Sequence, residues 1–86
     1  MEVLFKARVK KDLKKVPAYV AERFKKLVKE LKVNLIPARK FDVKKLKGFE
    51  HTFRVRIGGY RVIYEVCVED GLIIIHGILP REKAYK

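Results

Sequence analysis

Apolar and polar residues alternate most regularly over residues 53–64, on both sides of the pair Gly58 and Gly59. A two-residue glycine loop supplies the positive φ angles of a tight hairpin turn, so the pattern predicts two antiparallel strands in a defined register. Residues that oppose each other across such strands share a face of the sheet. One predicted face carries Arg54, Arg56 and Arg61, with Arg56 directly opposite Arg61. The other face is apolar and consists of Phe53, Val55, Ile57, Tyr60, Val62 and Tyr64.

A second hairpin turn is predicted at Asp70 and Gly71, after the preceding strand has continued to Val68. The Asp-Gly pair is a strong signal for a two-residue loop, and residues 72–79 then return as the last strand. This loop length predicts four pairs on the apolar face, namely Val68 with Ile73, Val66 with Ile75, Tyr64 with Gly77 and Val62 with Leu79. On the arginine face, it predicts Glu65 opposite His76, Cys67 opposite Ile74 and Ile63 opposite Ile78.

The N-terminal half of the chain predicts one strand and two helices. Alternation over residues 2–8 favours a first strand, and residues 10–16 favour a short helix that ends before Pro17. From Pro17 onward we expect a helix with one apolar stripe, formed by Val20, Phe24, Leu27, Val28 and Leu31. Residues 42–46 predict a further short strand. The expected fold is therefore one α+β domain over residues 1–86, an antiparallel β-sheet with two N-terminal helices packed on one face, in the order β-α-α-β-β-β-β.

The chain carries a formal net charge of +12, with 22 lysines and arginines against 10 aspartates and glutamates. This bias favours a polyanionic partner, with nucleic acid first, an acidic protein second and an anionic membrane surface third. Because opposed like charges destabilise a sheet, the pair of Arg56 and Arg61 favours a bound anion over a merely solvated arginine face. The sequence has no apolar run long enough for a transmembrane helix, no signal-peptide pattern and a single cysteine, so we expect a cytoplasmic protein with no membrane partner.

Most catalytic constellations are missing from this sequence. There is no serine, and His51, His76 and Cys67 do not make a zinc site, so the sequence predicts neither a metal nor a cofactor. No glycine-rich loop precedes a helix, which argues against a nucleoside triphosphate site. Arginines, by contrast, hold phosphates bidentately and stabilise the charge that develops during phosphoryl transfer. Since RNA supplies its own nucleophile, the 2′-hydroxyl, a site of this kind needs neither a metal nor a catalytic serine to cleave it.

Residues 46–48 (Leu-Lys-Gly), the hairpin of residues 53–64, Arg81 and Tyr85 together resemble the RelE toxins of the RelE/ParE superfamily. The resemblance extends over nearly the whole chain and is greatest to short archaeal members. It implies a ribosome-dependent endoribonuclease that cuts mRNA in the ribosomal A site, inhibits translation, and is held inactive by a small acidic antitoxin. Two alternatives stay open: a ParE-like inhibitor of DNA gyrase, and a non-catalytic module that binds RNA or the ribosome.

The resemblance also implies roles for individual residues. Arg54 and Arg56 correspond to basic residues that contact the mRNA backbone and take part in catalysis. Arg61 corresponds to the arginine that binds the scissile phosphate, and Arg81 to the arginine that stabilises the transition state. Tyr85 corresponds to a tyrosine that stacks on a base, with a role in proton transfer left open. The predicted RNA-binding lysines are Lys45, Lys47, Lys83 and Lys86.

Two features depart from the family pattern. Bacterial relatives commonly carry lysines where this chain has Arg54 and Arg56, and an arginine, with a pKa above about 12, is a poor general base. The candidates for that base are Lys47, Lys83 and Tyr85, or electrostatic stabilisation alone carries most of the acceleration. Strict alternation along the last strand sends Arg81 to the apolar face, so its place on the arginine face requires a break at Pro80.

Overall fold

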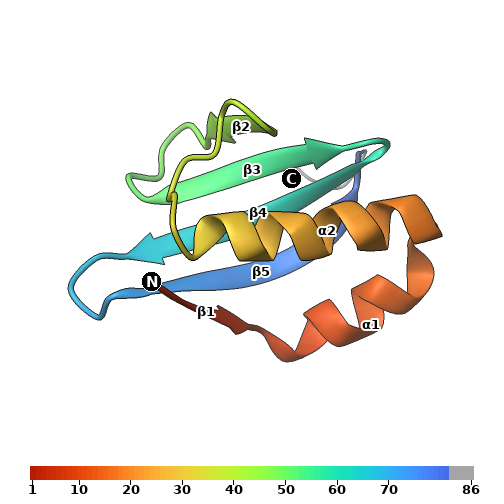
Figure 1. Ribbon diagram of the computed structural model, residues 1–86, viewed down its shortest axis with the longest axis horizontal. Helices are drawn as coiled ribbons and strands as arrows, with labels where there is room; N and C mark the ends of the chain where they lie inside the picture. The colour runs from red at the N-terminus through yellow and green to blue at the C-terminus, as the bar shows by residue number, and fades with distance from the viewer. Residues whose placement is uncertain (82–86) are drawn as a thin grey trace.

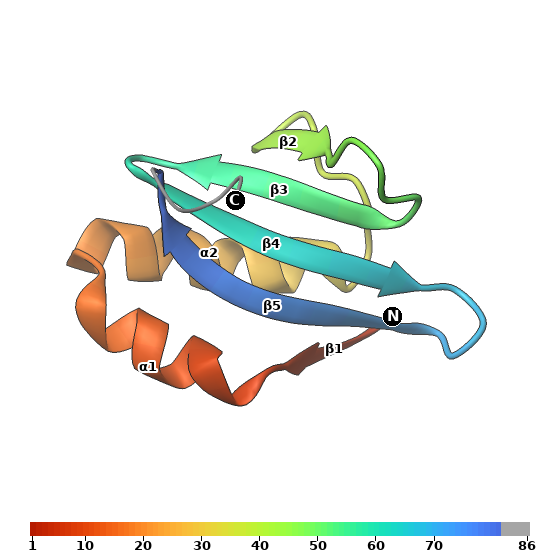
Figure 2. The same cartoon turned by 180° about the vertical axis from the view of Figure 1, so that it is seen from behind.

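The computed structural model describes residues 1–81 of the chain. Its elements in chain order are β1 (Glu2–Phe5), α1 (Ala7–Lys15), α2 (Ala18–Leu31), β2 (Asp42–Lys45), β3 (Thr52–Ile57), β4 (Tyr60–Cys67) and β5 (Leu72–Pro80). The strands form one sheet; α2 lies across one of its faces, and α1 lies beside the β5 edge (Figure 1). Seen from behind, the other face carries no helix of the described chain, and we call it the open face (Figure 2). The predicted α+β architecture and element order are confirmed.

The sheet is mixed, whereas the sequence predicted a purely antiparallel sheet. Its strand order is β1-β5-β4-β3-β2. β1 runs parallel to β5, with Glu2 opposite Leu72 and Phe5 opposite Ile75, whereas the other neighbouring strands are antiparallel. The alternation of side chains along a strand carries no information about the direction of its neighbour, so the sequence pattern did not reveal this parallel pair.

The first strand is shorter than predicted and does not include residues 6–8. After Phe5, the backbone N–H of Lys6 donates to the carbonyl of Ile75 at 3.0 Å, and α1 begins at Ala7. Val9 is buried, but it belongs to the helix rather than to an extended strand. Val9 and Leu13 lie four positions apart, so both reach the core from the same face of α1, and the helical period prevails over the strand-like alternation.

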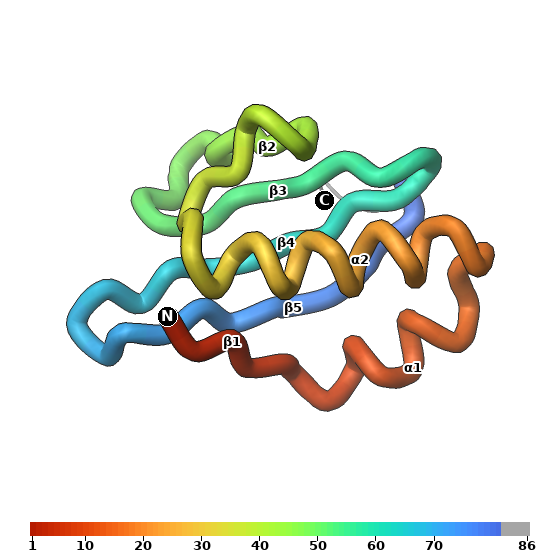
Figure 3. The backbone as a smooth tube through the Cα atoms, viewed as in Figure 1, coloured from red at the N-terminus to blue at the C-terminus, as the bar shows by residue number. Residues whose placement is uncertain are grey.

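Helix α2 forms where the sequence predicts it, directly after Pro17. Its apolar stripe packs into the core, with Val20, Phe24, Leu27 and Leu31 buried and Val28 half-buried. This stripe covers the apolar face of the sheet, which explains why the helices leave the open face uncovered. Residues 32–41 then carry the chain from the end of α2 to β2, at the sheet edge farthest from β1 (Figure 3).

The β3–β4 hairpin has the predicted register, with Arg56 opposite Arg61. Gly58 in its turn has a φ of 58°, and a Cβ atom at this position would collide with the Tyr19 hydroxyl of α2. The positive φ angle therefore favours glycine here, and a larger residue would also require the exposed Tyr19 side chain to move. On the core face of the hairpin, Val55, Ile57, Val62 and Tyr64 are buried. The opposite side chains of the hairpin consequently belong to the open face.

The predicted register between β4 and β5 is wrong at its start because the loop is longer than two residues. Cys67 pairs with Leu72, so the loop comprises residues 68–71. Val66 consequently lies opposite Ile73 rather than Ile75, a shift of two residues that keeps every side chain on its predicted face. Val68, predicted in the core, lies in the loop and is 61% exposed.

A β-bulge farther along the same pair exchanges the faces of β5. Tyr64 pairs with Ile75 and Ile63 pairs with Gly77, so His76 is an extra residue. Beyond the bulge, a one-residue slip moves each β5 side chain to the face opposite the prediction. The predicted faces of two residues are therefore wrong. Ile78, opposite Val62, is buried in the core, and Leu79, opposite Arg61, lies on the open face. β5 ends at Pro80, as predicted, so strand alternation does not determine the side to which Arg81 turns.

Asp12 of α1 holds the part of β5 that follows this bulge. β1 ends at Phe5, so here β5 has no neighbouring strand on that edge. The Asp12 carboxylate oxygen Oδ2 accepts hydrogen bonds from the buried backbone N–H of Ile78 at 3.0 Å and from Arg8 Nε at 3.1 Å. A Cβ atom at Gly77 would lie 3.0 Å from Arg8 Nε, so glycine permits the close approach of α1. The carboxylate thus replaces the missing strand as an acceptor.

Candidate nucleic-acid interface

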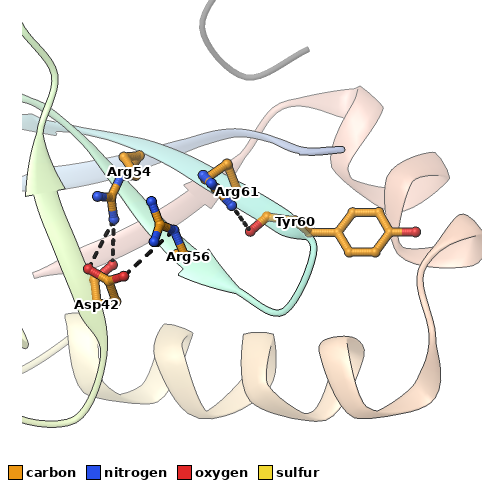
Figure 4. Close-up of polar contacts among 5 residues, drawn as sticks. All are labelled: Asp42, Arg54, Arg56, Tyr60 and Arg61. Atoms are coloured by element: carbon orange, nitrogen blue, oxygen red, sulfur yellow. Dashed lines mark hydrogen bonds and ion pairs between the residues drawn. The ribbon is translucent and has the colours of Figure 1, made fainter. Parts of the chain in front are cut away.

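The three hairpin arginines lie together on the open face (Figure 4). β3 contributes Arg54 and Arg56, and β4 contributes Arg61 directly opposite Arg56. The expectation of an open, solvent-facing arginine surface is correct only for Arg56, because Arg54 is 6% exposed and Arg61 is 2% exposed. Burial holds these two guanidinium groups in fixed positions and lowers the local dielectric, which strengthens their effect on any anion that reaches them.

Asp42, the first residue of β2, is the carboxylate partner of this arginine cluster. Arg54 Nη1 donates to the Asp42 carboxylate oxygen Oδ1 and to the Asp42 backbone carbonyl, both at 3.1 Å. Arg56 Nε lies 3.7 Å from the second carboxylate oxygen, Oδ2, so the carboxylate lies between the two guanidinium groups (Figure 4). The hydrogen bond from Arg54 lowers the pKa of Asp42, against an opposing effect of burial, and the charges of Arg54, Arg56 and Arg61 lower it further.

Arg61 is held by its own strand rather than by Asp42. Its Nη1 atom donates to the backbone carbonyl of Tyr60 at 3.4 Å. The Tyr60 ring points away from the arginines (Figure 4) and packs against the core. Arg61 nevertheless lies near enough to the Asp42 carboxylate for its charge to lower the pKa of that group. The three arginines therefore form one electrostatic unit around a single carboxylate.

A groove of about 1140 Å³ crosses the open face beside the arginines. We call it the basic groove, and its lining residues are Lys44, Lys45, Leu46, Lys47, Gly48, Phe49, Glu50, Arg54, Arg56, Ile63 and Leu79. Five of these side chains are cationic and one is anionic, so the groove has a strongly positive potential. The fold thus brings four predicted site residues to one surface: Lys45, Lys47, Arg54 and Arg56.

The remaining predicted residues lie beside the groove or outside the described chain. Arg61 borders the groove, because it is opposite Arg56 on one side and Leu79 on the other. Arg81 directly follows β5 and is exposed, and its backbone N–H donates to the carbonyl of Gly59 at 2.9 Å. This bond holds the Arg81 backbone beside the hairpin loop that leads into the strand of Arg61. The predicted residues Lys83, Tyr85 and Lys86 lie outside the described residues.

The residues of this surface that the sequence did not predict include Asp42, Lys44 and Phe49. Asp42 lies opposite Arg56 in the β2–β3 ladder, but the loop between these strands has no short turn from which the register could be read. Phe49 is 59% exposed in that same loop, directly after Gly48. No signal in the sequence separates Phe49 from Phe41, which also has charged neighbours but is buried.

Other titratable groups of the described chain show no sign of an activated nucleophile or a metal site. Burial, followed by the charges of Glu65 and Asp70, raises the pKa of the Cys67 thiol, which disfavours the thiolate. His76 Nε2 and Glu65 Oε1 are 2.9 Å apart, although the ladder places Glu65 opposite Ile74. Within residues 1–81, no group of three or more His, Cys, Asp and Glu side chains is arranged to hold a metal ion. None of the helices in that range combines the length and the apolar character needed to cross a membrane.

The sequence pattern of a known protein family matches residues 3–85, and the family is described as the ParE toxin of type II toxin–antitoxin systems, parDE. The chain belongs to this family. The toxin is 52% identical to the protein named RelE1 of Methanocaldococcus jannaschii over 79 residues, which are 92% of this chain and 88% of that relative. It is 37% identical to toxin RelE3 of the same organism over 86 residues, 99% of this chain and 96% of the relative. Within the family, it is a RelE-type toxin, as the resemblance implied.

Solved structures of RelE toxins share the fold of this toxin. RelE in the archaeal RelE–RelB complex from Pyrococcus horikoshii matches with a TM-score of 0.82 and 36% identity, covering 96% of this chain and 97% of that one. RelE in the RelB–RelE complex from Methanococcus jannaschii matches with a TM-score of 0.83 and 34% identity, covering 96% and 95%. The isolated E. coli RelE toxin matches with a TM-score of 0.73 and 27% identity, covering 96% and 86%.

Proposed function

We propose that this toxin is a ribosome-dependent endoribonuclease that cleaves mRNA in the ribosomal A site and thereby inhibits translation. The observation that carries the proposal is the gathering of Arg54, Arg56 and Arg61 on one sheet face, beside a groove with five cationic side chains. Positively charged grooves of this kind track the backbone of single-stranded nucleic acid. The relatives named RelE support the same assignment.

The proposed reaction takes its nucleophile from the RNA itself. The 2′-hydroxyl oxygen attacks the adjacent phosphorus, so the P–O2′ bond forms while the P–O5′ bond breaks. The 2′-hydroxyl proton passes to a general base, and the departing 5′-oxygen accepts a proton. The products are a 2′,3′-cyclic phosphate and a 5′-hydroxyl end. The contribution of the protein is to align the two reacting atoms and to stabilise the charge on the phosphate oxygens.

In this scheme the arginines have different tasks. Arg61 holds the non-bridging oxygens of the scissile phosphate, and because only 2% of this residue is exposed, binding has to uncover its guanidinium group. Arg81 stabilises the additional charge of the transition state from its position after β5. Arg54 and Arg56 hold the RNA backbone on the open face, together with Lys45 and the lysines of the tail. The candidates for the general base are Lys47, which lines the basic groove, Lys83 and Tyr85, and the alternative is that electrostatic stabilisation alone carries most of the acceleration. Tyr85 also stacks on a base.

We further infer that a small acidic antitoxin binds this toxin. The net charge of +12 and the basic groove call for an anionic partner when the toxin is not on the ribosome. The two archaeal structures that match this chain are complexes of RelE with RelB, which supports the same inference. Co-purification with the product of the neighbouring reading frame tests it. If no small acidic protein from that locus suppresses the toxicity, the inference is wrong.

The cleavage of mRNA on translating ribosomes tests the proposed activity. Arg81→Ala removes an exposed side chain, so we expect an unchanged melting temperature and a cleavage rate at least about a hundredfold lower. Arg61 is buried, so Arg61→Ala is paired with Arg61→Lys, which retains the charge but loses the bidentate geometry. Lys10→Ala removes one charge from an exposed position of α1 and is the matched control. Cleavage at the parental rate by both Arg81→Ala and Arg61→Lys would refute the assignment.

Inhibition of DNA gyrase is a second candidate, because the family description names ParE. The same purified toxin can be added to a gyrase supercoiling reaction. A toxin that blocks supercoiling and leaves ribosome-bound mRNA intact would replace the first proposal with this one. Binding to RNA without effect in either assay would instead indicate a non-catalytic binding module.

A further inference from the structure

Phe49 places an exposed aromatic ring at the basic groove. It belongs to the loop between β2 and β3 and is 59% exposed. The other large exposed apolar residues of the described chain are not part of the groove lining. Among residues 1–81, the aromatic ring contacts join Phe5 to Phe24 and Phe53 to Tyr64, so Phe49 has no ring partner there. Its ring is therefore available to a molecule that enters the groove.

The backbone of the loop holds Phe49 in a defined place. The N–H of Leu46 donates to the carbonyl of Thr52 at 2.8 Å, which closes the base of the loop. The N–H of Phe49 donates to the carbonyl of Leu46 at 3.2 Å, and Gly48 between them has a φ of 87°. These two bonds fix the turn before any ligand arrives, so little conformational entropy is lost when the ring makes a contact.

The charged and apolar residues that line the groove indicate which class of ligand it binds. Lysines and arginines outnumber the single acid, Glu50, which requires an anionic chain. The groove also has apolar surface from Leu46, Ile63 and Leu79, which an anion alone would leave in contact with water. Unpaired RNA combines both properties, because its phosphates are charged and the faces of its bases are flat and apolar. In a duplex these base faces are hidden by stacking on one another.

We propose that the Phe49 ring stacks on an unpaired base of single-stranded RNA bound in the basic groove. The proposal rests on the RNA substrate proposed above and adds a base contact in the β2–β3 loop. The neighbouring Lys47 and the groove arginines hold the phosphates on either side of the stacked base. Stacking on an aromatic side chain tolerates any base, so Phe49 contributes to affinity rather than to sequence preference.

Two oligonucleotides of equal length separate stacking from phosphate binding. One is single-stranded RNA with all its bases, and the other has abasic sites but the same sugar–phosphate backbone. Phe49→Leu should weaken binding of the full chain to the first about 5- to 150-fold, as expected for the loss of one base–aromatic contact, and leave binding to the second unchanged. Phe49→Trp should retain the affinity, and its indole fluorescence should be quenched on binding. The parent has no tryptophan, so that signal is unambiguous.

Phe5→Leu is the matched control, because Phe5 is also a half-exposed phenylalanine but lies in β1, away from the groove. Its affinity for either oligonucleotide should equal that of the parent. Equal affinities of Phe49→Leu and the parent for the base-containing RNA would overturn the proposal. Equal weakening for both oligonucleotides would also overturn it, since the ring would then only shape the groove. A loss confined to binding of the co-expressed acidic antitoxin would assign Phe49 to a protein interface instead.

These binding measurements use no ribosome, so their outcome does not depend on whether the toxin cleaves mRNA. If Phe49→Leu loses affinity for base-containing RNA while no variant or parent cleaves mRNA, the stacking contact stands and the catalytic proposal does not. If the parent cleaves mRNA and Phe49→Leu binds and cleaves like the parent, the catalytic proposal stands and the stacking contact does not.

Discussion

The carboxylate of Asp12 gives a quantitative prediction, because its removal leaves one identified backbone group without an acceptor. Asp12→Ala removes the hydrogen bond to the buried N–H of Ile78 and the ion pair with Arg8. An unsatisfied buried donor costs about 1–3 kcal/mol. The Arg8 side chain is 55% exposed, so its ion pair adds little. Alanine favours the helix over aspartate by about 0.5 kcal/mol, and we therefore expect a net loss of about 1–2 kcal/mol.

Thermal unfolding measures this loss, which for a domain of this size lowers the melting temperature by about 4–16 °C. Asp12→Asn keeps an acceptor oxygen and should be destabilised less, while Arg8→Ala should be nearly neutral. Amide hydrogen exchange provides a local readout, because the N–H of Ile78 should lose its protection in Asp12→Ala. If Asp12→Ala and Arg8→Ala unfold at the same temperature, the contribution of Asp12 is an ordinary surface ion pair and the reasoning about the edge of β5 is wrong.

Three further predictions concern Asp42, the hairpin turn and the basic groove. Since Arg54 lowers the pKa of Asp42 in the folded state, the stability from this pair is present above the ordinary aspartate pKa of about 3.9 and is lost as the pH falls through the folded-state value. As the pH is lowered through and below the ordinary aspartate range, the melting temperature of Asp42→Asn should therefore fall less than that of the parent, and equal falls would contradict this. Gly58→Ala should be destabilised by about 1–2 kcal/mol in thermal unfolding, whereas Gly59→Ala, with open space at its Cβ position, is the matched control. The affinity for single-stranded RNA should fall with salt, and Lys47→Ala should reduce the logarithmic slope by about 0.7, with Lys10→Ala unchanged. A flat response to salt would show that the groove does not bind phosphates.

The arginine face was predictable from the sequence because a local signal determines it. Gly58 and Gly59 fix the register of the β3–β4 hairpin, so the partners of Arg54, Arg56 and Arg61 follow from counting alone. The apolar stripe of α2 was predictable for a similar reason, since its period lies within one continuous segment. The burial of Arg54 and Arg61 was not, because it depends on side chains that other strands bring to the same face.

The errors occurred where non-local structure overrides a local pattern. Asp70 and Gly71 belong to a longer loop. No pattern within β5 indicates the bulge at His76 or the hydrogen bond from Ile78 to Asp12 of α1 that follows it. The partnership of Asp42 with Arg54 requires the pairing of β2 and β3 across a loop without a diagnostic turn. The parallel pairing of β1 with β5 joins the two ends of the described chain, which periodicity does not connect.

The position of Asp42 between two arginines has a consequence for the way RNA binding is measured. An RNA phosphate carries condensed cations from the buffer, and a lysine or arginine that pairs with the phosphate releases those cations to the solution. Arg54 instead already holds an anion that belongs to the protein itself. A phosphate that takes the place of this carboxylate leaves Asp42 as an unpaired anion, which attracts cations from the buffer and offsets those released from the RNA. The salt dependence would then count fewer phosphates than actually touch the protein, and the difference between the slopes of the parent and Asp42→Asn would give the number exchanged internally.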